Sequence, residues 1–292
     1  MFDGIKLDFE HADIAASLLV NPLFKFTITA DISTGEVVKY KASHKGLTFF
    51  VYPSNRVLIF GSLHIFYNME FKGIRQNYDL FSLSKVTMAI TALANILHMP
   101  ASEIVVRNIE FGFNIELKSN VNIKKLLQNF IVYSNRQSFN EKGYEDGGYY
   151  ISLTSTEAII KFYDKGIKYM LPQKLIRIEK KIKTMRNLSK SPIYLSDLAN
   201  REFWLKCQGN LMNMFKNCLF INPNVKIKMD KKEQNLIEKF IEPNFWEELT
   251  VAQRFYYSKE KLPMLNDKFN LDETKLELTR IMVSSFEDLI NS

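Results

Sequence analysis

Apolar and polar residues alternate along many segments of the chain, which is the pattern of half-buried β-strands. The first third contains a series of such segments, separated by turn signals, at residues 4–9, 23–30, 36–42, 47–52 and 57–67. Further alternating segments follow at residues 103–117, 149–153, 157–163 and 174–185. Their number and their short connections predict a meander of antiparallel strands.

Helical periodicity replaces this alternation in other parts of the chain. Residues 83–99 follow a candidate N-cap, Ser82, and end before Pro100, with apolar side chains recurring every three or four positions. Helices are also expected at residues 11–19 and 122–133, and a loop at residues 143–148. Beyond residue 190 the patterns are helical, at residues 196–220, 230–249 and 271–291. We therefore predict an α+β domain over residues 1–190 and a smaller all-helical domain over residues 191–292.

Three of the predicted strands carry polar residues at every second position, alternating with apolar ones. If these strands are neighbours, their polar side chains share one face of the antiparallel sheet, and the helices cover the opposite face. The residues concerned are Glu110 and Asn114 on the first strand, Lys161 and Tyr163 on the second, and Arg177, Glu179 and Lys181 on the third. An open polar face of this kind suits a long, flat, anionic ligand such as single-stranded DNA.

Positive charge is concentrated in the segment that contains two of these strands. The chain has 39 Lys and Arg, 32 Asp and Glu and a net charge of +7, yet residues 118–190 alone hold 15 basic and 6 acidic residues. A basic segment attracts polyanions because each neutralised phosphate releases condensed counterions. Nucleic acid is the partner that this distribution favours, and an ordinary solvated basic surface is the alternative.

Composition narrows the class of protein further. A hydrophobic content of 46% and an aromatic content of 13% are typical of a folded globular chain. The two cysteines, Cys207 and Cys218, lack the spacing of a zinc site, so a reducing, cytoplasmic setting is expected. The longest uncharged run, residues 86–102, contains Thr, Asn, His and Pro, which indicates a buried helix and no membrane partner.

Carboxylates and a tyrosine on one sheet face suggest phosphodiester chemistry. Glu110 and Glu179 offer the hard oxygen ligands that Mg²⁺ or Mn²⁺ prefer. A divalent ion there could polarise a phosphate oxygen while Tyr163 supplies the attacking oxygen. Tyrosine ionises only near pH 10, so help is expected from the metal and from Lys161 and Lys165. The alternative is structural, with the glutamates paired to neighbouring cations and Tyr163 an ordinary amphipathic surface residue.

The cations of this face are candidates for contacts with DNA phosphates, namely Lys161, Lys165, Arg177 and Lys181. His64, expected on a strand among aromatic residues, is a further candidate for a phosphate or relay role. A lone histidine in such a position is more often a packed, hydrogen-bonded residue, so both interpretations stay open.

Four short motifs follow one another along the chain: Gly61-Ser62-Leu63-His64, Asn108-Ile109-Glu110-Phe111-Gly112-Phe113-Asn114-Ile115, Phe162-Tyr163-Asp164-Lys165-Gly166 and Ile176-Arg177-Ile178-Glu179-Lys180-Lys181. In this order the sequence resembles phage and plasmid replication initiation proteins, and most of all the rolling-circle initiators of the trans-acting Rep type. In that family an acidic strand motif, a Tyr-Asp/Asn-Lys strand and an Arg-x-Glu strand surround the nicking site. The resemblance covers roughly residues 56–190.

The resemblance implies sequence-specific, metal-dependent nicking and rejoining of one DNA strand, with Tyr163 as the nucleophile. Glu110 and Glu179 would hold the metal together with Asn114, which stands where the motif has a second acidic residue and is a weaker ligand. Lys165, like the arginine of the last motif, would contact phosphate. The expected partner is single-stranded DNA or an origin duplex, with a host helicase and a second copy of the chain as further candidates.

Other functions stay open on the sequence alone. Because Asn114 is neutral, and because the paired-histidine motif of the larger histidine-based initiator superfamily is absent, the chain could be a non-catalytic DNA-binding protein on the same fold. It could also be a structural or RNA-binding phage protein. The leading hypothesis is a replication initiation protein that nicks its origin through Tyr163 for rolling-circle replication.

Overall fold

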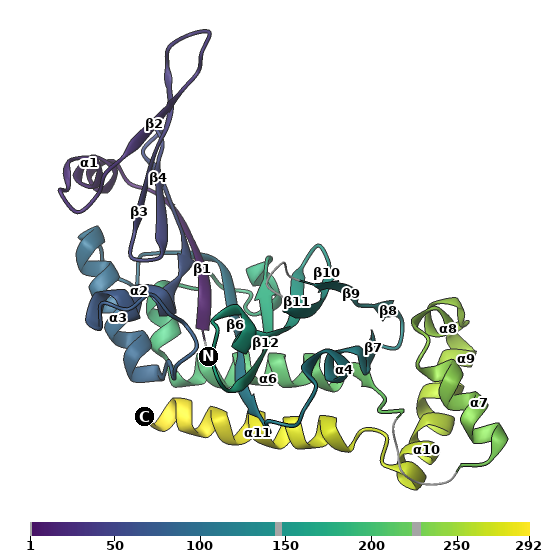
Figure 1. Cartoon of the computed structure of the whole chain (residues 1–292). Helices are drawn as coiled ribbons and strands as arrows, with labels where there is room; N and C mark the ends of the chain where they lie inside the picture. Colours follow the sequence, from purple (N-terminus) through teal and green to yellow (C-terminus); the bar gives the residue numbers. More distant parts are fainter. Residues whose placement is uncertain (1, 144–147, 224–228) are drawn as a thin grey trace.

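A ten-stranded antiparallel sheet forms the centre of the computed structural model, which describes residues 2–143, 148–223 and 229–292 (Figure 1). The strand order in this sheet is β2-β3-β4-β5-β1-β6-β12-β11-β10-β9, and β13, β7 and β8 form a second, smaller sheet. The α+β class with an antiparallel sheet is therefore confirmed. No helix within the described ranges is long and apolar enough to cross a membrane.

The strands have the following bounds: β1 Phe2–Glu10, β2 Thr27–Ala30, β3 Val37–His44, β4 Leu47–Val51, β5 Arg56–Ser62, β6 Val106–Leu117, β7 Phe130–Tyr133, β8 Gln137–Ser138, β9 Asn140–Gly143, β10 Tyr149–Thr154, β11 Ala158–Asp164, β12 Lys174–Ile182 and β13 Cys218–Phe220. The α-helices are α1 Ala12–Val20, α2 Leu63–Phe71, α3 Leu83–Leu97, α4 Ile123–Gln128, α5 Lys165–Lys168, α6 Arg201–Lys216, α7 Lys231–Phe240, α8 Pro243–Glu248, α9 Val251–Tyr256, α10 Leu262–Phe269 and α11 Glu273–Asn291. Two 3₁₀ turns, Met185–Asn187 and Leu195–Ala199, and a π-helical turn, Tyr257–Lys261, complete the described elements.

Helices cover the apolar face of the sheet, as the alternation predicts. In Figure 1 α6 and α11 run beneath the central strands, and both contact β6. Aromatic rings fill this interface, since Phe2 meets Trp204 edge-on at 5.1 Å between ring centroids and Phe113 meets Phe286 at 6.4 Å. Burial of such large rings supplies much of the driving force for folding.

The helices beyond residue 190 divide between two hydrophobic cores. Side chains of α6 and α11 belong to the main core under the large sheet. Helices α7 to α10 enclose a second core with β7 and β13, built around Phe240, Trp246, Leu265 and Phe269. The domain boundary near residue 190 stays a prediction, but two helices of the C-terminal part pack directly on the predicted N-terminal domain.

Three predicted elements were wrong in type over part of their length. The helix expected over residues 196–220 ends at Lys216, and residues 218–220 form β13. The strand expected over residues 57–67 ends at Ser62, and α2 begins there because the Ser62 hydroxyl accepts a hydrogen bond from the Ile65 amide at 3.0 Å. The helix expected over residues 122–133 ends at Gln128, and the β-branched, aromatic run that follows forms β7, paired with β13. Most of the loop expected at residues 143–148 lies outside the described residues.

At Gly112 the backbone of β12 leaves no room for a side chain on β6. An added Cβ would lie 2.2 Å from the Ile178 carbonyl oxygen and 2.7 Å from the Glu179 Cα atom. We expect Gly112→Ala to force the two strands apart and to lower the free energy of unfolding by about 1–3 kcal/mol. Gly209→Ala is the matched control, because Gly209 is exposed in α6 with no atom near its Cβ position, and should stabilise the protein by about 0.5–1 kcal/mol. Urea unfolding of both variants tests this, and equal effects would contradict the crowding at Gly112.

Candidate active site

The sheet register brings the predicted polar residues onto one face of three adjacent strands. Tyr163 on β11 lies opposite Arg177 on β12, and Lys161 lies opposite Glu179. On the other side of β12, Arg177 lies opposite Asn114 of β6, and Lys181 lies opposite Glu110. The strands that the sequence could only propose as neighbours are therefore hydrogen-bonded to one another, in the order β6-β12-β11.

Arg177 connects the charged groups of this face. Its Nε donates to Glu179 Oε2 at 2.6 Å and its Nη1 donates to Asn114 Oδ1 at 3.0 Å. The Tyr163 hydroxyl donates to the same Glu179 oxygen over 3.5 Å. Arg177 is 3% exposed and Glu179 is 7% exposed, so each charge is stabilised by the other in place of water.

Asp3 completes this network, and the sequence pattern did not reveal it. Its carboxylate lies 3.6 Å from Arg177 Nη2 and accepts hydrogen bonds from Ser62 Oγ and, at 2.6 Å, from Asn77 Nδ2. Between Phe2 and Ile5 the pairing of β1 with β6 shifts register, which places Asp3 among the polar groups. The available signal was Gly4 inside an alternating strand, because an isolated glycine there suggests a bulge.

Tyr163 is a buried phenol, with 4% of its surface exposed. Burial, and next the negative charge of Glu179, raise the pKa of the hydroxyl well above its usual value of 10, and Arg177 opposes this only in part. The cations were expected to lower the pKa of the phenol, but this pKa is raised. In the conformation described, Tyr163 is held as a neutral hydroxyl that points to a carboxylate acceptor.

Glu110 lies in a cleft of about 480 Å³ that Asp3 and Lys181 also line. Burial, and next the charges of Glu179 and Asp3, raise the pKa of the Glu110 carboxyl to about 8. Carboxylates that crowd one another in this way would be relieved by a divalent cation. Within the described ranges no group of three or more His, Cys, Asp or Glu side chains is arranged to hold a metal ion. Mg²⁺ often takes only one or two protein carboxylates and completes its shell with water and phosphate. Glu110 and Glu179 are diagonal neighbours on one face of β6 and β12, so they are the pair that would hold such an ion.

Asn114 has contacts unlike those of a metal ligand. Its amide oxygen accepts the hydrogen bond from Arg177, and its Nδ2 donates to the Tyr78 carbonyl at 3.2 Å. It lies four residues along β6 from Glu110, which corresponds to roughly 13 Å in an extended strand. The two side chains point to different parts of the face, and Asn114 is placed to orient Arg177.

Lys161 and Lys181 are the half-buried cations of the site. The Lys161 ammonium lies 4.9 Å from the centroid of the Tyr163 ring and 4.6 Å from that of Tyr150, in cation–π geometry. Lys181 lines the cleft beside Glu110. An anionic ligand that enters the cleft would therefore meet the positive charge of Lys181, and Lys161 lies on the same sheet face beside Tyr163.

Lys165 was expected to contact DNA phosphate, but it is fully buried and cannot reach DNA in this conformation. Its ammonium donates to the carbonyl oxygen of Asn77 at 2.6 Å. Burial, and next the charge of Arg177, lower its pKa to about 7. The Lys165 side chain therefore anchors the segment that contains Asn77.

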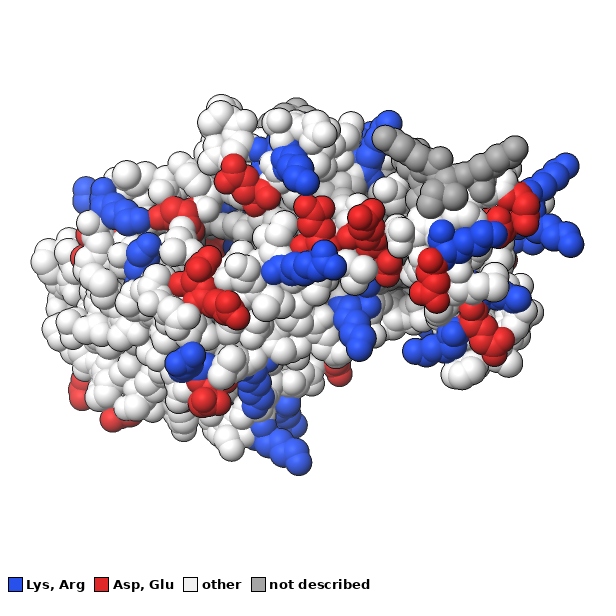
Figure 2. Space-filling model, turned by 90° about the horizontal axis from the view of Figure 1, so that it is seen from below, with Lys and Arg blue, Asp and Glu red and all other residues white. Residues whose placement is uncertain are grey.

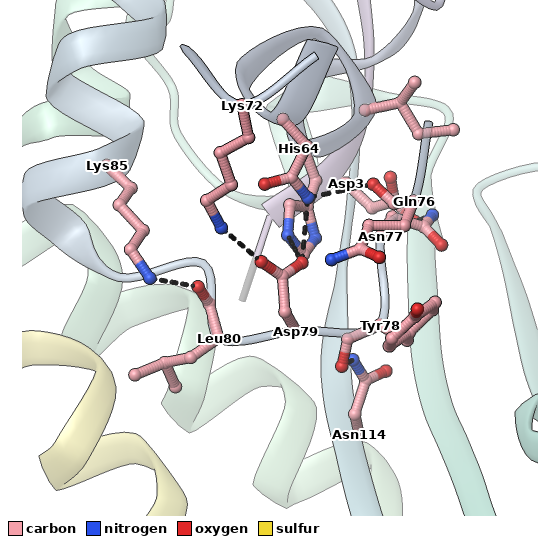
Figure 3. Close-up of polar contacts among 12 residues, drawn as sticks. Asp3, His64, Lys72, Gln76, Asn77, Tyr78, Asp79, Leu80, Lys85 and Asn114 are labelled. Atoms are coloured by element: carbon pink, nitrogen blue, oxygen red, sulfur yellow. Dashed lines mark hydrogen bonds and ion pairs between the residues drawn. The ribbon is translucent and has the colours of Figure 1, made fainter. Parts of the chain in front are cut away.

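That segment, residues 73–81, is called the strap because it crosses the polar face between α2 and α3 (Figure 3). Asn77 is bound by Asp3 and Lys165, and its side-chain oxygen accepts a hydrogen bond from the Tyr169 hydroxyl. The Tyr78 carbonyl is bound by Asn114. The strap is thus tied to the residues that surround Tyr163, so the polar face is covered at this point.

Asp79 holds the other end of the strap against α2. It accepts hydrogen bonds from Asn68 Nδ2 at 2.8 Å and Lys72 Nζ at 2.6 Å, and it lies 2.8 Å from His64 Nε2 (Figure 3). His64 stacks on Phe81 with ring centroids 4.4 Å apart and is 3% exposed. In this conformation His64 is a packed histidine on a helix that fastens the strap, and it does not face an open surface.

The fastening of the strap predicts a pH dependence of stability. Burial lowers the pKa of His64 to about 4, more than the hydrogen bond to Asp79 raises it. Because the folded-state pKa lies below the unfolded value of about 6.5, this stability is fully present above pH 6.5 and is lost as the pH falls through 4. We expect the melting temperature of the wild type to fall between pH 6.5 and 4 more than that of His64→Gln, with a free-energy difference of up to about 3 kcal/mol. The exposed His98→Asn is the control, and parallel profiles for all three proteins would contradict the prediction.

No family model matches the chain, and no curated protein matches it. Among solved structures, the chain is similar to the rolling circle replication initiator protein from Geobacillus stearothermophilus. The match covers 93% of this chain and 96% of that chain, at 13% sequence identity and a TM-score of 0.44. A likeness at this level carries no argument about chemistry, so the site is interpreted from its own side chains.

Proposed function

We propose that this chain is a replication initiation protein of the rolling-circle type, which cleaves one DNA strand by attack of Tyr163. The observation that carries the proposal is the register of β6, β12 and β11, which gathers a tyrosine, an arginine and carboxylates beside a cleft. The order of the motifs along the chain, which resembles that of such initiators, supports the same reaction. The basic excess of residues 118–190 suits a DNA substrate.

In the proposed reaction the Tyr163 oxygen attacks the phosphorus atom of a backbone phosphodiester. Its proton passes by way of Glu179 Oε2, the acceptor that the hydroxyl already faces, to solvent, so Glu179 remains ionised. The bond from phosphorus to the 3′ oxygen breaks, and the 3′ oxygen leaves as a hydroxyl with a proton from solvent. The products are a 5′-phosphotyrosine link and a free 3′ end, so the bond energy is kept for rejoining.

Charge on the phosphate has to be balanced during this attack. Within the described structure the Nη2 of Arg177 makes no hydrogen bond. Once Arg177 is released from part of its other contacts, this nitrogen can bind a phosphate oxygen. Glu110 and Glu179 would hold Mg²⁺ or Mn²⁺, which when bound polarises a phosphate oxygen. Lys161 and Lys181 would receive the neighbouring phosphates, and Asn114 would orient Arg177.

The covalent link gives the proposal a direct test. The protein is incubated with Mn²⁺ and with end-labelled single-stranded and duplex DNA from the region flanking its own gene. We expect a labelled adduct that survives denaturation and disappears with EDTA. Absence of an adduct on both forms of that DNA, at concentrations where binding is saturated, would overturn the proposal.

A non-catalytic DNA-binding protein on the same fold is the second candidate. The buried, neutral Tyr163 and the engagement of Asn114 by Arg177 are the observations that favour it. This candidate predicts salt-sensitive binding that neither Mn²⁺ nor EDTA alters, with no strand cleavage.

A further inference from the structure

Aromatic side chains interrupt the polar face of the sheet on the strands beyond β1. Phe50 on β4 and Phe60 on β5 point to the same side as Lys6 of β1, because Phe60 pairs with Lys6 and with Thr48, two residues from Phe50. Phe60 is 40% exposed, and the Phe50 ring stacks on it with centroids 5.7 Å apart and planes inclined by 28°. Tyr52 continues the row, 6.4 Å from Phe50.

The opposite side of the same strands is an ordinary core. Phe49, Val57 and Ile59 alternate with these rings and are completely buried. The rings of Phe50 and Phe60 are therefore not needed to fill that core. Phe60 is exposed and Phe50 and Tyr52 are half-buried, and neighbouring rings that stay accessible on a sheet face are candidates for a binding surface.

Basic side chains surround these rings. The Lys39 ammonium lies 4.9 Å from the centroid of Phe50, and Lys41 pairs with Phe50 across β3 and β4 on the same face. Arg56 lies over the Tyr52 ring at 5.5 Å, although Asp8 neutralises it through two hydrogen bonds of 2.7 Å. Aromatic rings interleaved with lysines are the equipment that binds single-stranded nucleic acid, with bases stacked on rings and phosphates on cations.

This surface runs directly into the candidate active site. Phe60, Leu58 and Lys6 line the same cleft as Glu110 and Lys181. From β4 to β11 there are five strand spacings of about 4.8 Å, so the rings lie roughly 24 Å from Tyr163 across the sheet. In Figure 1 strands β2 to β4 rise away from the helical body, which extends this surface beyond the site.

The side of the molecule that carries α11 shows no concentration of positive charge in the described residues (Figure 2). Figure 2, which views the structure from below, shows basic and acidic side chains interspersed, without a patch of one sign. Lys118 pairs with Glu277 of α11 at 3.5 Å, for example. A strand of DNA would find balanced charge on this side, whereas the face with the rings combines cations and stacking surfaces.

We propose that Phe50, Phe60 and Tyr52, with Lys6, Lys39 and Lys41, form a stacking platform for single-stranded DNA that leads the strand into the cleft at Glu110. The proposal rests on the proposed function, because the platform would hold the strand that Tyr163 cleaves. Three partly exposed rings would accommodate about as many bases, and binding would be tolerant of sequence because every base has a stacking face.

The test measures binding of fluorescein-labelled oligo(dT)20 by anisotropy in EDTA, so that cleavage does not interfere. We expect the double variant Phe50→Ala, Phe60→Ala to bind at least roughly tenfold more weakly, because each stacked base contributes a similar factor. The double variant Phe50→Tyr, Phe60→Tyr keeps both ring faces and should bind like the wild type. Phe255→Ala, which removes an exposed ring on α9, should also leave binding unchanged.

The outcomes separate the platform from the nicking reaction. Unchanged oligo(dT)20 binding by the folded alanine variant would overturn the platform, even if the wild type forms an adduct. Weakened binding with no adduct in any protein would support the platform and overturn the nicking. An equal loss of binding to duplex DNA would overturn the assignment to a single strand. The double variant Lys39→Gln, Lys41→Gln should make DNA binding less sensitive to salt. The slope of the logarithm of the binding constant against the logarithm of the salt concentration should fall in magnitude by about 0.7 for each phosphate that the two lysines neutralise in the wild type.

Discussion

Replacing Tyr163 with phenylalanine should abolish the covalent DNA adduct, a loss of at least about 10³-fold, while the protein still folds and still binds DNA. The phenol oxygen is the only heavy atom removed, and its hydrogen bond to Glu179 is long at 3.5 Å. Glu179 keeps its stronger bond to Arg177 at 2.6 Å, so no buried carboxylate loses its cation. The adduct is measured as labelled DNA that stays with the denatured protein.

Tyr150→Phe is the matched control for this experiment. Tyr150 pairs with Tyr163 across β10 and β11, and its ring contacts the same Lys161 ammonium. A second hydroxyl is thereby removed from the same face without touching the proposed nucleophile. An adduct that persists in Tyr163→Phe, or that disappears in Tyr150→Phe alone, would move the nucleophile to another residue.

The alternation of side chains was sufficient to predict which strand residues share one face of the sheet. Because a strand has a period of two, the parity of Glu110, Tyr163 and Arg177 fixes the face on which each lies, provided that the strands are neighbours. The structure supplies that condition through the pairing of β6, β12 and β11. Asn114 was grouped with Glu110 as a metal ligand because of the family motif, although roughly 13 Å of strand separates the two residues.

The residues that the sequence did not reveal depend on irregular backbone. Asp3 joins the polar face only through a shift in the pairing of β1 with β6, and such shifts leave little trace in an alternating pattern. The strap has no periodicity, so its hydrogen bonds through Asn77 and Asp79 could not be predicted. His64 was placed on a strand because an apolar run preceding it hides the N-cap at Ser62.

Burial of Tyr163 also has a consequence for how the proposed reaction begins. Tyr163 is only 4% exposed, so its hydroxyl is not open to a phosphodiester, and the strap is fastened to Asp3, Lys165 and Asn114 on the same face. We therefore expect the reactive form to be one in which the strap has moved. If the closed form dominates, the rate of adduct formation at saturating DNA is proportional to the fraction of molecules in which the strap is open.

Removing the Asp79 carboxylate should raise that fraction and accelerate adduct formation by on the order of 100-fold. Asp79→Ala eliminates the contacts of the strap with His64, Asn68 and Lys72, and hydrogen bonds to a charged group contribute about 1.5–3 kcal/mol each. Ile74→Ala is the control, because Ile74 belongs to the strap but its side chain is half exposed and apolar. Hydrogen exchange of the strap amides gives a readout that does not depend on cleavage. If the strap amides of Asp79→Ala exchange faster but the adduct forms at an unchanged rate, the strap does not limit the reaction. If both hydrogen exchange and adduct formation become faster, the opening of the strap is the step that exposes Tyr163.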